Sequence, residues 1–192
     1  MKILLLLPKG VEILEASAFI DVFGWNKLHN PTKTEIITCG FTREIITTYG
    51  IPIKVDILIE EVSVKDYDAL AVPGGFEEFG FYDEAFDERF LEIIGKFNDD
   101  NKYIASICTG ALPLGKSGIL KGKKATTYHL AEGKRQKQLE GFGATIGNES
   151  IITEGNIITS HGPSTALGVA FKLLEMLTSP EEAEKTKELM GF

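Results

Sequence analysis

The feature that most constrains the fold of this chain is a regular alternation between short apolar runs and longer amphipathic segments. The runs Ile3–Leu7, Ala69–Val72 and Tyr103–Ile107 have the length of strands and are almost continuously apolar, as expected for parallel strands covered on both faces. Each is followed by a segment in which apolar residues return at helical intervals. The pattern predicts βαβ units, and hence an α/β domain with a doubly wound, mostly parallel sheet and helices on both faces.

The remaining elements are read from the same two periodicities. We expect a single domain over residues 1–192, because a division into two would leave each half short of core. A hairpin arm is expected within 43–62, and a second hairpin across residues 154–156. Further strands are expected at 35–39, 125–127, 150–152 and 156–159, and helices from residue 11 or 12 and at 86–98, 111–117, 129–140, 163–177 and 180–190.

Charge and cysteine content exclude several classes of partner. The longest apolar run is far shorter than the roughly 20 residues of a membrane-spanning helix, so no membrane partner is expected. A formal net charge of −8 argues against nucleic acid, since phosphate binding needs clustered Lys and Arg. Cys39 and Cys108 permit one disulfide at most, and no secretory signal is recognisable, so we expect a cytoplasmic protein with free thiols.

Chemically useful side chains gather where the predicted strands end. Ligands of open parallel sheets bind beyond these carboxyl ends, so a small-molecule site is expected there. The candidate residues are Glu15, Gly75, Cys108, Thr109, Tyr128, His129 and His161. Their spacing does not indicate a metal site, and we expect neither a metal nor another cofactor.

Cys108 stands between a predicted strand and a predicted helix, in the order Ser106-Ile107-Cys108-Thr109-Gly110. A side chain on so tight a turn is pushed clear of the sheet, as in the nucleophile elbow of α/β-hydrolases, although Ser106 replaces the usual first glycine. A helix N-terminus also favours the thiolate. We therefore predict an exposed, reactive thiol; the alternative is a buried, inert cysteine, which we expect for Cys39.

Glu15 is the expected partner of this thiol, because it follows the first strand at the same edge of the sheet. Desolvation would raise its pKa, so that a protonated carboxyl can donate to the thiolate or pass on a proton. Glu12 points elsewhere by helix phase. The backbone N–H groups of Gly75 and Thr109 are candidates for binding an oxyanion.

Four separated segments carry a resemblance: Lys9-Gly10-Val11-Glu12 with Glu15 and Asp21, then 67–75 (YDALAVPGG), 106–111 (SICTGA) and 159–163 (TSHGP). In this order they resemble the ThiJ/PfpI superfamily, over nearly the whole chain. The resemblance implies a flavodoxin-like fold with a nucleophile elbow at Cys108, Glu15 as acidic partner, oxyanion contacts from Gly75 and Thr109, and a homodimer.

Departures from the family patterns narrow the expected activity. PfpI-type peptidases carry His where Thr109 stands, so a Cys-His peptidase triad is not expected. The late His-x-Glu pair of glutamine amidotransferases is missing. The glyoxalase and deglycase branch has His and Arg at the positions of Tyr128 and His161. The Cys-Thr-Gly-Ala run is similar to isonitrile hydratases, which place Asp at the position of Glu15.

The expected function is therefore a cysteine-dependent enzyme, a lyase or hydrolase of the glyoxalase or deglycase type, that acts on small carbonyl electrophiles with Cys108 as nucleophile and Glu15 moving protons. Glu15 favours this branch. One alternative is an isonitrile-hydratase-like enzyme. The other is a non-catalytic protein that senses oxidative stress through oxidation of Cys108.

Overall fold

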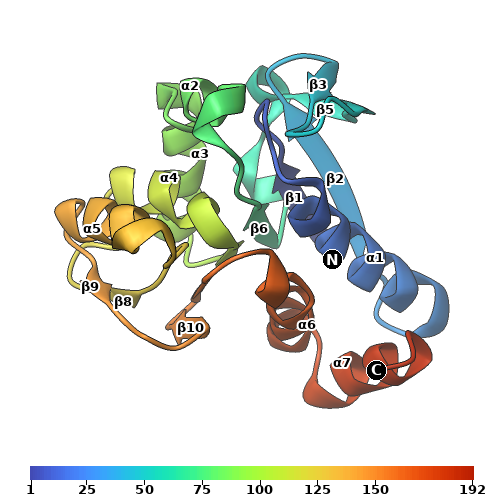
Figure 1. Ribbon diagram of the computed structural model, residues 1–192. Coiled ribbons are helices and arrows are strands. Elements are labelled where there is room, and N and C mark those ends of the chain that lie inside the picture. The colour runs from blue at the N-terminus through green and yellow to red at the C-terminus, as the bar shows by residue number, and fades with distance from the viewer.

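A computed structural model describes residues 1–192 and shows a central twisted sheet between two layers of helices (Figure 1). The main sheet has seven strands in the order β10-β11-β7-β6-β1-β2-β5. They are β1 (Lys2–Leu6), β2 (Glu35–Gly40), β5 (Ile57–Leu58), β6 (Ala69–Val72), β7 (Tyr103–Ser106), β10 (Ile151–Glu154) and β11 (Ile157–Ser160). All neighbours are parallel except β10 and β11, which form the second predicted hairpin.

The strand order confirms the predicted fold class. Within the sheet, β2, β1, β6, β7 and β11 follow one another in the 2-1-3-4-5 order of flavodoxin-like folds. Side chains of successive strand residues point to opposite faces, so β1 serves two cores. Ile3 and Leu5 belong to one, and Leu4 and Leu6 to the other.

Each face of the sheet is covered by its own group of helices. On one face lie α1 (Ile13–His29), α6 (Ala166–Leu177) and α7 (Pro180–Leu189), which pack against each other. The other face carries α3 (Glu88–Asp99), α4 (Ala111–Lys116) and α5 (Lys134–Gly141), together with the short α2 (Phe81–Ala85). Figure 1 shows the two groups on opposite sides of the strands. None of the helices combines the length and apolarity needed to cross a bilayer.

Two small sheets lie outside the main one. The predicted hairpin arm is formed by β3 (Glu44–Ile46) and β4 (Pro52–Lys54), which pair antiparallel. The strand expected at 125–127 is shorter, at β8 (Lys124–Ala125), and pairs with β9 (Thr145–Ile146) rather than joining the main sheet.

The helix expected at 129–140 begins only at Lys134. Ala131, Glu132 and Gly133 all have positive φ, at 53°, 56° and 69°. The α-helix cannot include such left-handed residues, so it starts after them. The segment before α5 instead forms an irregular turn that borders the site described below.

The functional edge of the sheet lies where the strand order reverses, between β1 and β6. The loops that leave these two strands diverge, and a crevice forms between them. They are still tied together by backbone hydrogen bonds, from Glu12 N–H to Gly74 O (2.8 Å) and from Phe76 N–H to Gly10 O (3.2 Å). The turn after β7 opens into the same crevice.

Candidate active site

Cys108 occupies a strained turn between β7 and α4, which confirms the predicted elbow. Its φ is 56°, a left-handed conformation that costs a non-glycine residue roughly 1–2 kcal/mol. The turn is held from both sides: Ile107 N–H donates to Val72 O (3.2 Å), and the Thr127 hydroxyl donates to Cys108 O (2.7 Å). Gly110 is required, because a Cβ there would lie 2.3 Å from the Val72 carbonyl oxygen.

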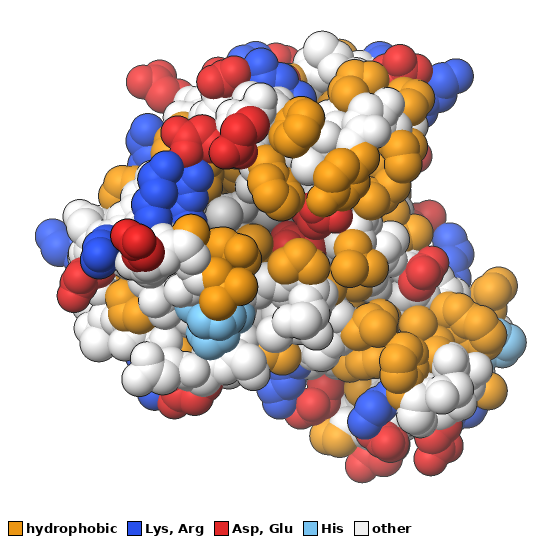
Figure 2. All heavy atoms as spheres, viewed as in Figure 1, with side chains coloured by type: hydrophobic (Ala, Val, Ile, Leu, Met, Phe, Trp, Pro, Cys, Tyr) orange, Lys and Arg blue, Asp and Glu red, His pale blue; other side chains and the backbone are white.

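The prediction that this thiol is exposed is wrong, because Cys108 has only 9 % of its surface accessible. The loops after the neighbouring strands cover it, and a Cβ on Gly162 would stand 4.0 Å from Sγ. The thiol lies in the wall of a cavity of about 450 Å³. Figure 2 shows the hollow near the centre of one face, with acidic side chains inside it.

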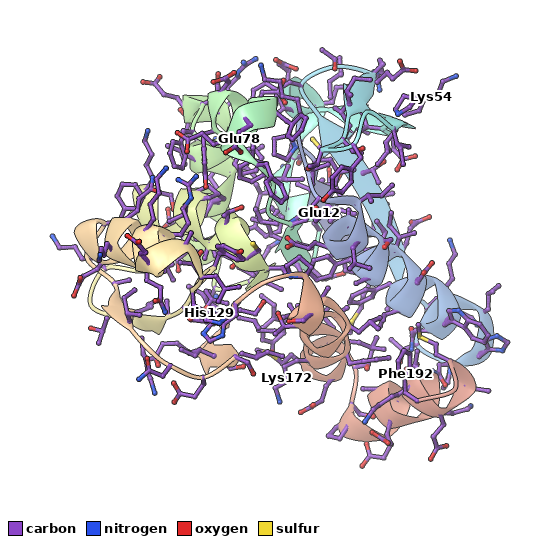
Figure 3. All side chains as sticks on the ribbon, viewed as in Figure 1. Glu12, Lys54, Glu78, His129, Lys172 and Phe192 are labelled. Carbon is purple, nitrogen blue, oxygen red and sulfur yellow. The ribbon has the colours of Figure 1, made fainter.

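Five of the seven predicted site residues line this cavity: Glu15, Gly75, Cys108, Thr109 and Tyr128. The two histidines do not. Their rings stack on each other, with centroids 4.2 Å apart, and His129 is exposed beside the site (Figure 3). The Nε2 atom of His161 is buried without a hydrogen-bond partner, and burial and the charge of His129 both lower its pKa.

Glu15 is fully buried in the first turn of α1. Its Oε2 accepts a hydrogen bond from Gly74 N–H at 2.6 Å, whereas Oε1 has no partner. Burial raises the pKa of this carboxyl to about 8, although the Gly74 N–H and the Cys108 thiol both act to lower it. Glu15 is therefore mostly protonated near neutral pH, as the sequence predicted.

The pKa of the Cys108 thiol is raised, mainly by burial and then by the negative charge that Glu15 carries when ionised. The backbone N–H and hydroxyl of Thr109 act in the opposite direction. The predicted effect of the helix N-terminus is therefore present, through Thr109 N–H, but burial outweighs it. The two acids are coupled, so the thiolate forms most readily when Glu15 keeps its proton.

The predicted oxyanion donors are only partly free. Gly75 N–H donates to Thr109 Oγ1 (2.9 Å), and the same hydroxyl donates to Gly75 O (2.8 Å). Gly75 N–H is thus already bonded, contrary to our expectation, whereas Thr109 N–H is directed at the Cys108 sulfur. Gly74 is required beside this pair, since a Cβ there would lie 2.7 Å from Thr109 Oγ1.

The cavity also contains charged residues that the sequence did not indicate. Glu12 lines it and is 7 % exposed; the helix-phase argument fails because Glu12 is the N-cap, before the helix begins at Ile13. Lys134 and Arg135 line it from α5, and both bond to Glu77. No sequence signal marked these two cations, because nothing fixed where α5 begins. No three His, Cys, Asp or Glu side chains converge to hold a metal ion.

Two known proteins are similar to this chain in sequence. The chain is 29 % identical over 182 residues to protein DJ-1 homolog B of Arabidopsis thaliana, covering 94 % of this chain but only 39 % of the relative's length. It is 30 % identical over 157 residues to a deglycase of Pyrococcus abyssi, covering 80 % of this chain and 90 % of the relative.

A solved structure is similar over the whole fold. The oxidized DJ-1 of Toxoplasma gondii superimposes with a TM-score of 0.82 at 26 % identity, over 98 % of this chain and 97 % of that one. The sequence profile of the DJ-1/PfpI family matches residues 1–176, a span that includes every residue of the candidate site. The resemblance to the ThiJ/PfpI superfamily is thereby confirmed, and the chain belongs to the DJ-1/PfpI family.

Proposed function

We propose that this protein is a cysteine-dependent enzyme that acts on small carbonyl electrophiles, with a glyoxalase-like or deglycase-like reaction. The observation that carries the proposal is the buried pair of Cys108 and Glu15 at the wall of a cavity of about 450 Å³. A cavity of this size admits a small molecule. The similarity to an archaeal deglycase supports the same reaction class.

The pair supplies the two functions that addition to a carbonyl needs. Cys108 attacks as the thiolate, after its proton has passed to solvent: an S–C bond forms to the aldehyde carbon of a 2-oxoaldehyde, and the carbonyl π pair moves to oxygen, which takes the proton of Glu15 and leaves that carboxyl ionised. For an early glycation adduct, the S–C bond forms as the C–N bond breaks, and the amine leaves with that proton. Both routes give the same hemithioacetal.

The remaining steps are proton transfers and hydrolysis. The ionised Glu15 takes the proton from the former aldehyde carbon and returns it to the adjacent carbonyl carbon, while the hydroxyl proton passes between the two oxygens. The first carbon is thereby oxidised to a thioester and the second reduced to an alcohol. Water cleaves the thioester to a 2-hydroxy acid and the free thiol.

Turnover of methylglyoxal to lactate tests this proposal. We expect Cys108→Ser to abolish it and Glu15→Gln to lower kcat by at least about 100-fold, the usual contribution of a general acid–base group. Cys39→Ala is the matched control, because Cys39 is the other buried cysteine and lies away from the cavity. Undiminished turnover by Cys108→Ser would sink the proposal. Hydration of an isonitrile without turnover of methylglyoxal would favour the isonitrile-hydratase alternative.

A second candidate function is oxidation sensing at the same thiol. It is supported by the arrangement of donors around the sulfur, since Thr109 N–H and a protonated Glu15 would both stabilise a sulfinate. Peroxide treatment followed by mass spectrometry tests it. Slow oxidation of Cys108, no faster than that of Cys39, would argue against a sensor.

We also propose a cytoplasmic, homodimeric protein. Both cysteines are free, which suits a reducing compartment. The dimer contact is proposed on the outer face of α1, where Ile20, Trp25 and Leu28 are exposed and Leu28 has 76 % of its surface accessible. Large apolar side chains grouped on one helix face are typical of an interface.

A further inference from the structure

Arg135 is a largely buried cation in the wall of the cavity that contains Cys108. Its side chain is only 14 % exposed. Nη2 donates to Glu77 Oε2 (2.7 Å), Nη1 donates to Gln138 Oε1 (3.0 Å), and the guanidinium lies 5.0 Å from the centre of the Tyr82 ring. Protein acceptors therefore use two of its five N–H donors, and Arg135 lines the cavity.

The carboxylate that is bonded to Arg135 is shared with a second cation. Glu77 Oε2 accepts from both Arg135 and Lys134, the second at 3.2 Å. Two cations thus share one carboxylate, and the three side chains together carry a charge of +1. A buried guanidinium with unused donors is a good partner for a planar anion, because its fork matches a carboxylate bidentately.

The charges of the cavity also give a ligand an orientation. Glu12 and Glu15 approach from the start of α1, and Arg135 from α5, while Figure 1 shows α1 and α5 on opposite sides of α4, the helix that follows Cys108. Glu78, which is labelled in Figure 3, also lines the cavity and is exposed. An anionic group is repelled from the Glu12 end and attracted to the Arg135 end.

We propose that Arg135 is the specificity-determining residue of this cavity and selects small carbonyl compounds or adducts that carry a carboxylate. The carboxylate binds the free N–H groups of Arg135, and the carbonyl carbon is presented to Cys108. Glu77 competes for the same guanidinium and so limits the affinity of Arg135 for the carboxylate of the ligand. The class of substrate rests on the proposed function, whereas the test below does not require turnover.

Two alkylating reagents of nearly the same shape test the inference without turnover. Iodoacetate carries a carboxylate, whereas iodoacetamide is neutral, and the ratio of their rates at Cys108 reports the preference of the cavity for an anion. Mass spectrometry of the Cys108 peptide separates this thiol from Cys39. We expect Arg135→Gln to lower the ratio of iodoacetate to iodoacetamide by about tenfold, the effect of losing one charge-assisted hydrogen bond.

Three further variants make the result specific. Arg135→Lys should keep part of the ratio, since it keeps the charge but not the fork. Glu77→Gln should raise the ratio, because it removes the competing carboxylate. Lys137→Gln is the matched control: it removes an exposed positive charge from the same helix, outside the cavity, and should change the ratio by less than about twofold.

The outcomes separate this inference from the proposed function. An unchanged ratio in Arg135→Gln, or an equal fall in Lys137→Gln, would each overturn the role of Arg135. None of these results depends on whether methylglyoxal is turned over. Conversely, full turnover by Cys108→Ser would refute the proposed reaction, but it would not change the alkylation ratio measured at Cys108 in the wild type and the Arg135 variants.

Discussion

Replacing Glu15 by Gln should change how the stability of the protein depends on pH. The carboxyl has a pKa of about 8 in the folded protein, raised by burial from an ordinary value of 4.5. Between these values the folded state holds a proton that the unfolded state has lost. The free energy of unfolding therefore falls as pH rises, with the stabilising contribution complete below pH 4.5 and lost by the time pH passes 8.

The size of the effect follows from the shift. A shift of one pKa unit corresponds to about 1.36 kcal/mol. The contribution of Glu15 to the free energy of unfolding therefore falls by about 3.5 kcal/mol between pH 5 and pH 8. Glu15 accepts a hydrogen bond from Gly74 N–H at 2.6 Å. The side-chain oxygen of glutamine can accept the same bond, but glutamine has no ionisable proton. Glu15→Gln should thus remove this pH dependence while retaining most of the stability measured at pH 5.

Urea unfolding of both proteins at pH 5, 6, 7 and 8 measures the difference directly. From pH 5 to pH 8, the free energy of unfolding of wild type should fall by about 3.5 kcal/mol relative to that of Glu15→Gln. Glu140→Gln, which removes an exposed carboxyl from α5, should run parallel to wild type. Parallel curves for wild type and Glu15→Gln would show that Glu15 is not protonated in the folded state, and the proposed proton transfer would lose its donor.

Three further substitutions, two of them paired with a control variant, test the packing of the site and the proposed dimer. Gly110→Ala places a Cβ 2.3 Å from a backbone oxygen and should cost about 2–3 kcal/mol, whereas Gly95→Ala, with nothing within 4 Å, should stabilise α3 by about 0.5–1 kcal/mol; urea midpoints distinguish them. Thr109→Val removes both buried bonds of its hydroxyl and should cost about 2 kcal/mol, while Thr109→Ser should cost less. Leu28→Glu should convert the dimer to a monomer in sedimentation; a monomeric wild type would refute the dimer.

The main sheet was predictable because each parallel strand is buried on both faces. Ala69–Val72 is buried at every residue, and such a run has no other stable place in a protein of this size. The short edge strand β5 and the helix α2 were not anticipated, since two and five residues carry no readable period. The start of α5 was misplaced because Ala131 and Glu132 adopt positive φ without being glycine, which no propensity indicates.

For the site, sequence order located the reactive turn but not its surroundings. Cys108 and Glu15 could be brought together from topology alone, because both follow strands whose ends meet at one edge. Burial of the thiol depends on loops that arrive from Gly162 and Tyr128, far along the chain. The ion pair between Arg135 and Glu77 likewise depends on side-chain rotamers in two segments that lie 58 residues apart in the sequence. Neither leaves a local pattern.

The burial of Cys108 changes which residue controls its reactivity. At an exposed elbow, the helix N-terminus would set the thiol pKa, and Glu15 would be an accessory. Here burial raises that pKa most, and an ionised Glu15 raises it further, so the thiolate forms more readily when Glu15 is protonated. Catalysis and oxidation both begin from that thiolate, and an oxidised sulfur cannot attack a carbonyl. The two candidate functions therefore compete for one proton-coupled thiol, and peroxide should inhibit turnover in proportion to the oxidation of Cys108.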